Sequence, residues 1–234
     1  MGGRILLFQL GDTPVYANAT IFILLLFCFI SYGTSPLPQS LALGFIYALG
    51  VLVSILLHEF GHSLVARQFG IKTNAIELHG LGGFCHLARS PKLRWQSIAI
   101  SIAGPLVNLG LYWVARHELL SLMQTSITID PSGNPTAGTP LPHALLVAIA
   151  SFATANFIMF VFNMLPAFPL DGGRALRNFL GYLMRDQFAI RIIAILGMLI
   201  GALTLLSMLQ FGIGIIFVGL YLLFENYQAF QDAK

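Results

Sequence analysis

Six apolar segments, each near the length of a bilayer-spanning helix, set the framework for this chain. A hydrocarbon core ~30 Å thick takes about 20 apolar residues in a helix. The sequence is 57% hydrophobic and only 9% charged, against about 25% charged residues in soluble domains. We therefore expect an all-α polytopic membrane protein that forms a single transmembrane domain over residues 1–234. The six predicted spans are Tyr16–Ser31, Leu41–Ala66, Trp95–Ala115, Ala144–Met164, Phe188–Leu209 and Phe211–Phe230.

The basic residues predict which ends of the spans face the cytoplasm. Of the 12 Lys and Arg residues, five lie between spans two and three, and four lie between or beside spans four and five. The opposite connections hold only Arg116. Cytoplasmic loops carry the excess of Lys and Arg, so both basic loops and both termini are predicted to be cytoplasmic. The default location is a prokaryotic plasma membrane.

Two stretches outside the long spans have the pattern of short β-hairpins near the cytoplasmic side. Ile76–His79 alternates in polarity like a strand and is followed by a glycine-rich break, which predicts a hairpin within Ile71–Ser90. Residues Ile5–Val15, with a turn at Asp12–Pro14, predict a second strand pair. The turn-forming residues of Leu120–Pro142 predict an external loop.

The second span contains three ionisable residues within five positions, in the order His58-Glu59-x-x-His62. A charged side chain at mid-membrane costs about 2.5 to 3.5 kcal/mol on insertion scales, so this group needs a compensating partner, and a bound metal ion would supply one. Residues i and i+4 share one face of a helix. His58 and His62 are therefore predicted to present two imidazoles to one ion, with Glu59 beside it. The remaining ligand must come from elsewhere.

Asp171 is the strongest candidate for a third ligand. Catalytic zinc usually has three protein ligands and an open position for water, and the ion should lie just below the cytoplasmic surface. Pro166 and Pro169 prevent a regular helix before Asp171, while Gly172 and Gly173 permit tight backbone geometry after it. Irregular backbone at membrane depth is tolerated where it lines a wet cavity, which hydrolysis inside a bilayer requires. The other candidates on this side are Glu77, His79, Cys85 and His86.

Asn163 lies at the same end of the fourth span, where its amide is able to hydrogen-bond a substrate carbonyl. At this point the sequence resembles the site-2 protease family of intramembrane metalloproteases. The resemblance rests on the His58-Glu59-x-x-His62 motif and on Asn163-x-x-Pro166 with Leu170-Asp171-Gly172, where Asp171 follows His62 by 109 residues. It extends to Gly82-Gly83 and to Gly104-Pro105-x-x-Asn108.

The resemblance implies one zinc ion per chain, bound by His58, His62 and Asp171, with Glu59 as the general base. Asn163 would contact the oxyanion. The resemblance further implies regulated proteolysis of a membrane-anchored protein substrate within the lipid bilayer. No nucleic-acid partner is expected. Many members of the family carry a PDZ or CBS domain, and this chain is expected to be a minimal form without either.

Other interpretations of the same residues remain open. In one interpretation, the motif residues of the second span form a polar cluster without a metal ion. In another, Asp171 is the N-cap of an amphipathic helix over Gly172–Tyr182. Asn108 is expected to form an interhelical hydrogen bond. Spans one, five and six carry little chemistry. The main alternative function is a divalent metal-ion transporter, and a further one is an inactive membrane scaffold.

Overall fold

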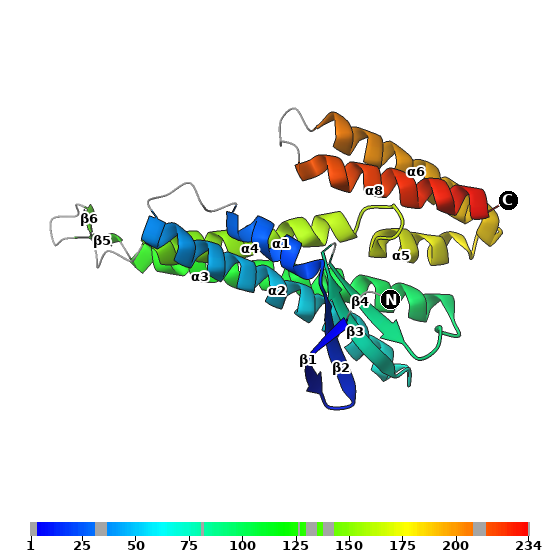
Figure 1. Cartoon of the computed structure of the whole chain (residues 1–234), viewed down its shortest axis with the longest axis horizontal. Helices are drawn as coiled ribbons and strands as arrows, with labels where there is room; N and C mark the ends of the chain where they lie inside the picture. The colour runs from blue at the N-terminus through cyan, green and yellow to red at the C-terminus, as the bar shows by residue number, and fades with distance from the viewer. Residues whose placement is uncertain are drawn as a thin grey trace. The chain divides into compact units, whose positions relative to one another are not determined.

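The computed structural model describes residues 4–30, 37–80, 82–125, 127–129, 135–137, 143–207 and 214–233 (Figure 1). The chain forms two compact units, and several helices pass from one unit into the other. Unit 1 comprises Met1–Phe60, Thr73–His86 and Leu106–Met159, and unit 2 comprises Gly61–Lys72, Leu87–Pro105 and Phe160–Lys234. Each unit is described by itself.

Unit 1 contains a four-stranded sheet in the order β1-β2-β3-β4. Strands β1 and β2 pair antiparallel, whereas β2 and β3 pair parallel with Val15 opposite Ile76. Both predicted hairpins are therefore confirmed as strand pairs, and the parallel pairing joins them into one sheet. The first turn lies at Gly11 and Asp12, one residue earlier than predicted, because Gly11 adopts a φ of 57° and Thr13 already begins β2. The strands are Arg4–Leu10, Thr13–Asn18, Thr73–His79 and Gly82–Leu87.

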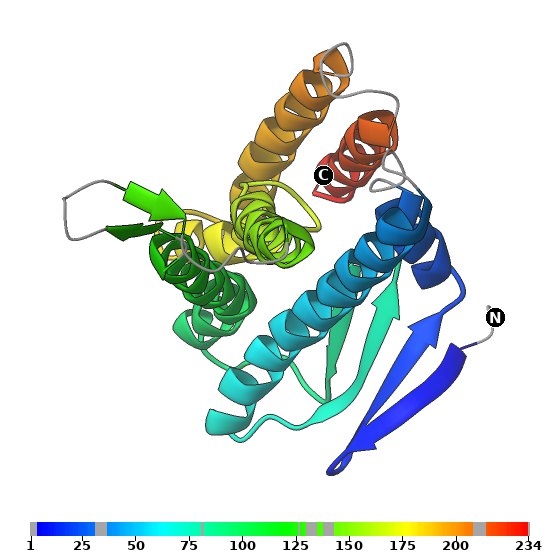
Figure 2. The same ribbon diagram turned by 90° about the vertical axis from the view of Figure 1, so that its left-hand side faces the viewer.

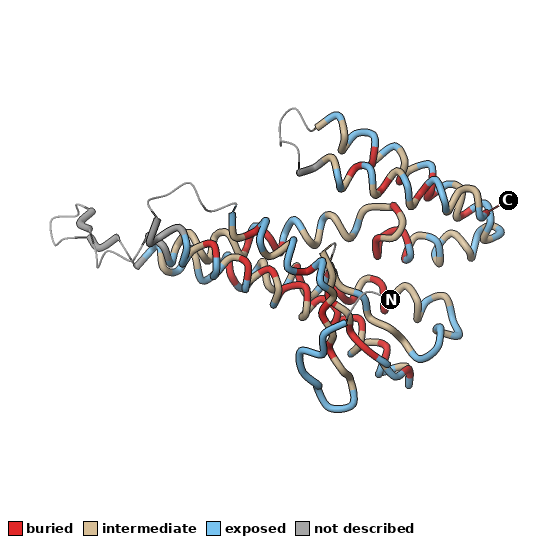
Figure 3. Tube along the Cα trace, in the orientation of Figure 1, coloured by how far each residue is buried: buried red, intermediate tan, exposed pale blue. Residues whose placement is uncertain are grey.

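One face of this sheet packs against helix α2 (Leu37–Gln68) and forms the core of unit 1. Val15 of β2 and Ile76 and Leu78 of β3 are at most 1% exposed. They share a cluster with Ile55, which lies one helical turn before His58. Figure 3 shows the buried stretches of the strands and of α2 in red. The sheet therefore supports the part of α2 that carries the histidine motif.

The remaining helices of unit 1 differ from the predicted spans at their ends. Helix α1 (Ile21–Ile30) begins only at Ile21, because Tyr16–Asn18 belong to β2, and its ten residues rise by about 15 Å. Helix α3 (Arg94–Thr125) continues beyond the predicted end at Ala115 into the segment expected to be an external loop. Strands β5 (Ile127–Ile129) and β6 (Pro135–Ala137) follow as a small hairpin. The predicted turn residues Asp130–Asn134 lie outside the described residues.

Unit 2 contains the last part of α4 (His143–Asn163), the short helix α5 (Asp171–Leu180) and two long helices, α6 (Asp186–Leu206) and α8 (Gly214–Asp232). Helices α6 and α8 run side by side (Figures 1 and 2). Glycines permit this close approach: a Cβ atom on Gly201 would lie 3.0 Å from the carbonyl oxygen of Gly219. Ala167 and Leu170, between α4 and α5, pack into a buried cluster with Leu222 of α8.

Among the described residues, four helices are long and apolar enough to cross a membrane. They are α2, α3, α4 and α6, which match predicted spans two to five. The first and sixth predicted spans are not among them, so six transmembrane helices remain a prediction. The predicted ends Ser31, Leu209 and Phe211 lie outside the described residues. The protein is a mostly helical, multi-spanning membrane protein with a small sheet.

Candidate metal centre

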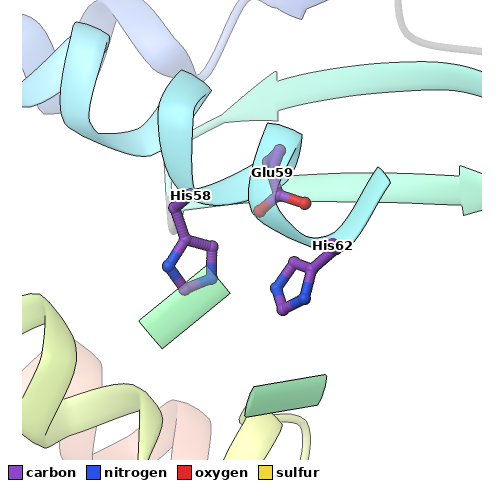
Figure 4. A group of neighbouring side chains, drawn as sticks. All are labelled: His58, Glu59 and His62. Atoms are coloured by element: carbon purple, nitrogen blue, oxygen red, sulfur yellow. The ribbon is translucent and has the colours of Figure 1, made fainter. Parts of the chain in front are cut away.

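His58, Glu59 and His62 lie close together on α2, as the sequence predicts. One potential ligand atom from each side chain lies within 4.8 Å of the corresponding atoms of the other two. All three residues are buried, with between 4% and 7% of their surface exposed. Figure 4 shows both imidazoles projecting from one side of the helix. The group thus has the spacing of a metal site and little access to bulk water.

Hydrogen bonds to the Nδ1 atoms fix the tautomers of both histidines. His62 Nδ1 donates to the carbonyl oxygen of Ile100 at 2.6 Å. His58 Nδ1 lies 2.5 Å from Asn108 Oδ1, which is the acceptor because the amide nitrogen of Asn108 donates to Asn156. Each neutral imidazole consequently carries its lone pair on Nε2. Metal-binding histidines have this arrangement, in which the second ring nitrogen donates a hydrogen bond to an oxygen atom. The two Nε2 atoms are therefore suited to bind a metal ion.

A buried polar chain extends behind His58 through three helices of unit 1. Asn108 of α3 donates to Asn156 Oδ1 of α4 at 2.9 Å, and Asn156 donates to the hydroxyl oxygen of Ser54 on α2 at 2.9 Å. Ser54 in turn donates to the carbonyl oxygen of Gly50 at 2.8 Å. The exposed fraction of Ser54, Asn108 and Asn156 is 0%. The predicted interhelical role of Asn108 is therefore confirmed, and Asn108 also orients His58.

Asp171 lies beside His62 within unit 2. Its Oδ2 atom is 3.2 Å from His62 Nε2, and Asp171 is only 7% exposed. Asp171 is the first residue of α5, and the N-cap position belongs to Leu170, so the reading of Asp171 as an N-cap is wrong. Backbone atoms of Met164 and Ala167 lie where Cβ atoms of Gly172 and Gly173 would be. These two glycines therefore let the start of α5 fold back against the segment that precedes it.

Glu59 is enclosed by strand β4 in unit 1. A Cβ atom on Gly83 would contact the Cγ and carboxyl atoms of Glu59. The absence of a side chain at Gly83 thus leaves room for the carboxylate. In the sequence, the Gly82-Gly83 pair was noted only as part of the family resemblance. The structure gives a steric reason for glycine at its second position.

The other four ligand candidates lie on strands β3 and β4. His86 Nε2 is 3.4 Å from a carboxylate oxygen of Glu77, and Arg4 also pairs with Glu77 at 3.5 Å. Burial raises the pKa of the Cys85 thiol to about 11, so Cys85 stays protonated at neutral pH. Burial lowers the pKa of His79, although Glu77 opposes this shift. None of the four joins the three-residue group on α2 in the described part of the chain.

Asn163, the remaining predicted site residue, is the last residue of α4 and is half-buried. It lies in unit 2 together with His62 and Asp171. The helix ends at this residue, and the irregular segment predicted from Pro166 and Pro169 follows directly. Asn163 therefore lies at the end of the fourth span, as predicted. Its contact with substrate stays a prediction.

Comparison with known proteins shows which peptidases the chain resembles. The sequence model of Peptidase family M50 matches residues 45–125. A solved structure, the site-2 protease from Methanocaldococcus jannaschii, aligns with a TM-score of 0.65 and 28% identity over 97% of this chain and 95% of that chain. The chain is therefore similar to members of peptidase family M50 in sequence and in fold. The resemblance predicted from the motifs is thereby confirmed.

Curated zinc metalloproteases are similar in sequence to most of the chain. A putative zinc metalloprotease of Synechocystis sp. is 31% identical over 91% of the chain, and a zinc metalloprotease of M. jannaschii is 33% identical over 96%. The chain spans only 55% and 60% of the lengths of these two relatives. The similarity to peptidases gives no support to the alternative of a metal-ion transporter.

Sequence reasoning missed three polar residues that bond to the site or to the segment leading into it. Ser54 and Asn156 belong to the chain behind His58, and Asn226 bonds the backbone of Phe168 from α8, in a span expected to carry little chemistry. Ser54 and Asn156 are polar residues within long apolar runs, which is itself a signal of function in a membrane helix. That signal was present in the sequence, but the partners are 48 to 102 residues away.

Proposed function

We propose that the protein is an intramembrane zinc metalloendopeptidase, which hydrolyses peptide bonds within or near the transmembrane segment of membrane-anchored proteins. The observation that carries the proposal is the 3.2 Å approach of Asp171 to His62. It joins two motifs that lie 109 residues apart in the chain. The curated relatives named as zinc metalloproteases support the same chemistry.

One zinc ion per chain would be held by His58, His62 and Asp171. Two Nε2 lone pairs and one carboxylate match the three protein ligands of hydrolytic zinc sites, which leave a further position open. When bound, zinc supplies Lewis-acid polarisation of the substrate carbonyl and lowers the pKa of water. Asn108 and the carbonyl group of Ile100 hold the imidazoles in the required tautomer.

Glu59 would act as the general base of the reaction. Its buried carboxylate takes a proton from the attacking water and returns it to the departing amine nitrogen, a role typically worth about 10²- to 10⁴-fold in rate. The amide group of Asn163 would donate a hydrogen bond to the carbonyl oxygen of the substrate, where negative charge develops. The buried surroundings strengthen both interactions, because water no longer screens them.

The sheet would bind the cleaved segment of the substrate in an extended form, since an intact helix shields its carbonyl groups by internal hydrogen bonds. An extended substrate can pair only with a strand that has an open edge. Strand β3 lies between β2 and β4, so it offers no open edge. The edge strand next to the proposed base is β4, where a Cβ atom added at Gly83 would meet the Glu59 side chain. An extended substrate pairing with β4 would therefore pass close to the base.

The proposed orientation follows the distribution of charges. Both termini and the two basic loops would be cytoplasmic, in a prokaryotic plasma membrane. With six spans and the histidine motif near the cytoplasmic end of the second, cleavage would release the cytoplasmic part of the substrate. The partners of the protein would accordingly be a membrane-anchored substrate and lipid, and no nucleic acid.

The test is zinc content and cleavage of a tagged single-span substrate by the purified protein in detergent. Glu59→Gln should keep zinc and lose cleavage, whereas Asp171→Ala should lose both. Asp186→Ala is a matched control, because Asp186 is likewise the first residue of a helix in unit 2, and it should retain both. Cleavage by Glu59→Gln at the parental rate would show that the proposed base is wrong.

A further inference from the structure

The segment that leads into Asp171 has few hydrogen bonds of its own. It has the sequence Pro166-Ala167-Phe168-Pro169-Leu170, and neither proline carries a backbone N–H group. The amide of Ala167 bonds the carbonyl oxygen of Leu165, and the amide of Leu170 bonds that of Ala167, both at 2.9 Å. Phe168 is held differently, because both of its backbone groups bond a side chain from another helix.

That side chain is Asn226 of α8. Its Oδ1 atom accepts the amide N–H of Phe168 at 2.9 Å, and its amide nitrogen donates to the carbonyl oxygen of Phe168 at 2.7 Å. The same nitrogen donates to the carbonyl oxygen of Leu222 at 2.8 Å, one turn back on α8. Asn226 is 0% exposed. The single side-chain amide of Asn226 therefore pairs with both backbone groups of Phe168, as a neighbouring β-strand would. Leaving these buried backbone groups without hydrogen bonds would cost free energy.

Helix α6 is shaped to admit this side chain. A Cβ atom added at Gly197 would collide with the Oδ1, Cγ and Nδ2 atoms of Asn226. Ala167 and Leu170, on either side of Phe168, are buried against Leu222 and are packed by Ile200. The amide of Asn226 is thus enclosed by α6 on one side and by the segment on the other.

We infer that Asn226 is a positioning residue for Asp171, acting through Phe168. Only Pro169 and Leu170 separate Phe168 from Asp171, and the hydrogen bond from the amide of Leu170 to the carbonyl oxygen of Ala167 ties this stretch together. Fixing Phe168 therefore fixes where α5 begins and places the carboxylate beside His62 Nε2. This inference rests on the proposed function, in which Asp171 is a zinc ligand. It adds that α8 sets the position of that ligand.

The first experiment measures hydrogen exchange of the metal-free full-length protein. Peptic fragments covering 166–170 report only the amides of Ala167, Phe168 and Leu170. Asn226→Leu, which keeps the size of the side chain and removes its hydrogen bonds, should speed exchange in this fragment about tenfold or more. Asn178→Leu is the matched control, because Asn178 bonds only the carbonyl group of Arg174 one turn back in its own helix. Its exchange in 166–170 should stay parental.

The second experiment measures the dissociation constant for zinc alone. Residues that orient metal ligands typically change affinity by about 10- to 100-fold, so Asn226→Leu should weaken zinc binding within that range while Asn178→Leu does not. Gly197→Ala offers a separate route, because it leaves Asn226 in the chain and fills its space. It should reproduce both effects. This variant decides the question if Asn226→Leu does not fold, as judged by size-exclusion chromatography and circular dichroism.

The outcomes separate this inference from the proposed function. Unchanged exchange in folded Asn226→Leu and Gly197→Ala would overturn the inference, and so would faster exchange with parental zinc affinity. A parent protein that neither binds zinc nor cleaves substrate would instead contradict the proposed function. In that case the exchange measurements would still decide whether Asn226 holds Phe168.

Discussion

His62 on α2 and Asp171 on α5 approach within 3.2 Å through Nε2 and Oδ2, although they lie 109 positions apart in the chain. The Nδ1 atom of the same imidazole donates to the carbonyl group of Ile100. The ring is therefore directed by a backbone acceptor on one side and faces a carboxylate on the other. A metal ion between them would use the nitrogen lone pair that this arrangement leaves on Nε2.

Removing the acceptor of His58 should weaken metal binding. In Asn108→Leu the Nδ1 proton of His58 loses its partner, and the tautomer with a lone pair on Nε2 is no longer enforced. We expect the zinc dissociation constant to rise about 10- to 100-fold, as measured by competition with a chelator. Asn156→Leu provides the comparison, because Asn156 bonds Asn108 and does not contact His58 in the described hydrogen bonds, and its effect should be smaller. Equal zinc affinity in Asn108→Leu and the parent would contradict the assigned role.

Adding one methyl group beside Glu59 should impair catalysis without removing zinc. The Cβ atom of Gly83→Ala would occupy space now filled by the Glu59 carboxyl group. A displacement of about 1 Å in a catalytic group costs on the order of 10²-fold in rate, so kcat should fall by that amount while zinc content stays parental. Gly110→Ala is the control, because no atom lies within 4 Å of the added Cβ atom there. Parental kcat in Gly83→Ala would show that β4 does not confine the base.

The rate of alkylation of Cys85 should keep rising with pH beyond the ordinary pKa of a thiol. Burial raises the pKa of this thiol from 9.0 to about 11, with the hydrogen bond from Thr73 opposing the shift and Glu59 adding to it. Because the thiolate is the reactive form, a raised pKa lowers reactivity at neutral pH. In a Cys28→Ala background, the iodoacetamide rate should rise about tenfold per pH unit up to pH ~10. A plateau near pH 9 in the folded protein, as expected for the unfolded chain, would contradict the buried position.

Much of the site was predictable because its signals are local in sequence. The placement of His58 and His62 on one face requires only a helix, and the end of α4 requires only Pro166 and Pro169. The strand pairs follow from alternation and glycine-rich turns in the same way. These elements needed no knowledge of distant contacts.

Contacts between distant segments were not predictable from such patterns. The parallel pairing of Val15 with Ile76 makes one sheet of two hairpins, and it draws Tyr16 into β2 at the expense of the first predicted span. The partnership of Asn226 with Phe168 likewise depends on how α8 packs. An apolar pattern predicts that a segment is a helix in a membrane, but it does not specify which buried amide meets which backbone group.

The most direct test of the account is X-ray absorption spectroscopy at the zinc edge on Asp171→Cys, prepared with Cys28→Ala and Cys85→Ala. Zinc–sulfur bonds are about 2.3 Å long and zinc–nitrogen or zinc–oxygen bonds about 2.0 to 2.2 Å, so a sulfur ligand is readily distinguished. If residue 171 binds the metal together with His58 and His62, the spectrum should show one sulfur atom at the longer distance. Zinc bound at parental stoichiometry with only nitrogen and oxygen neighbours would contradict the proposed metal centre.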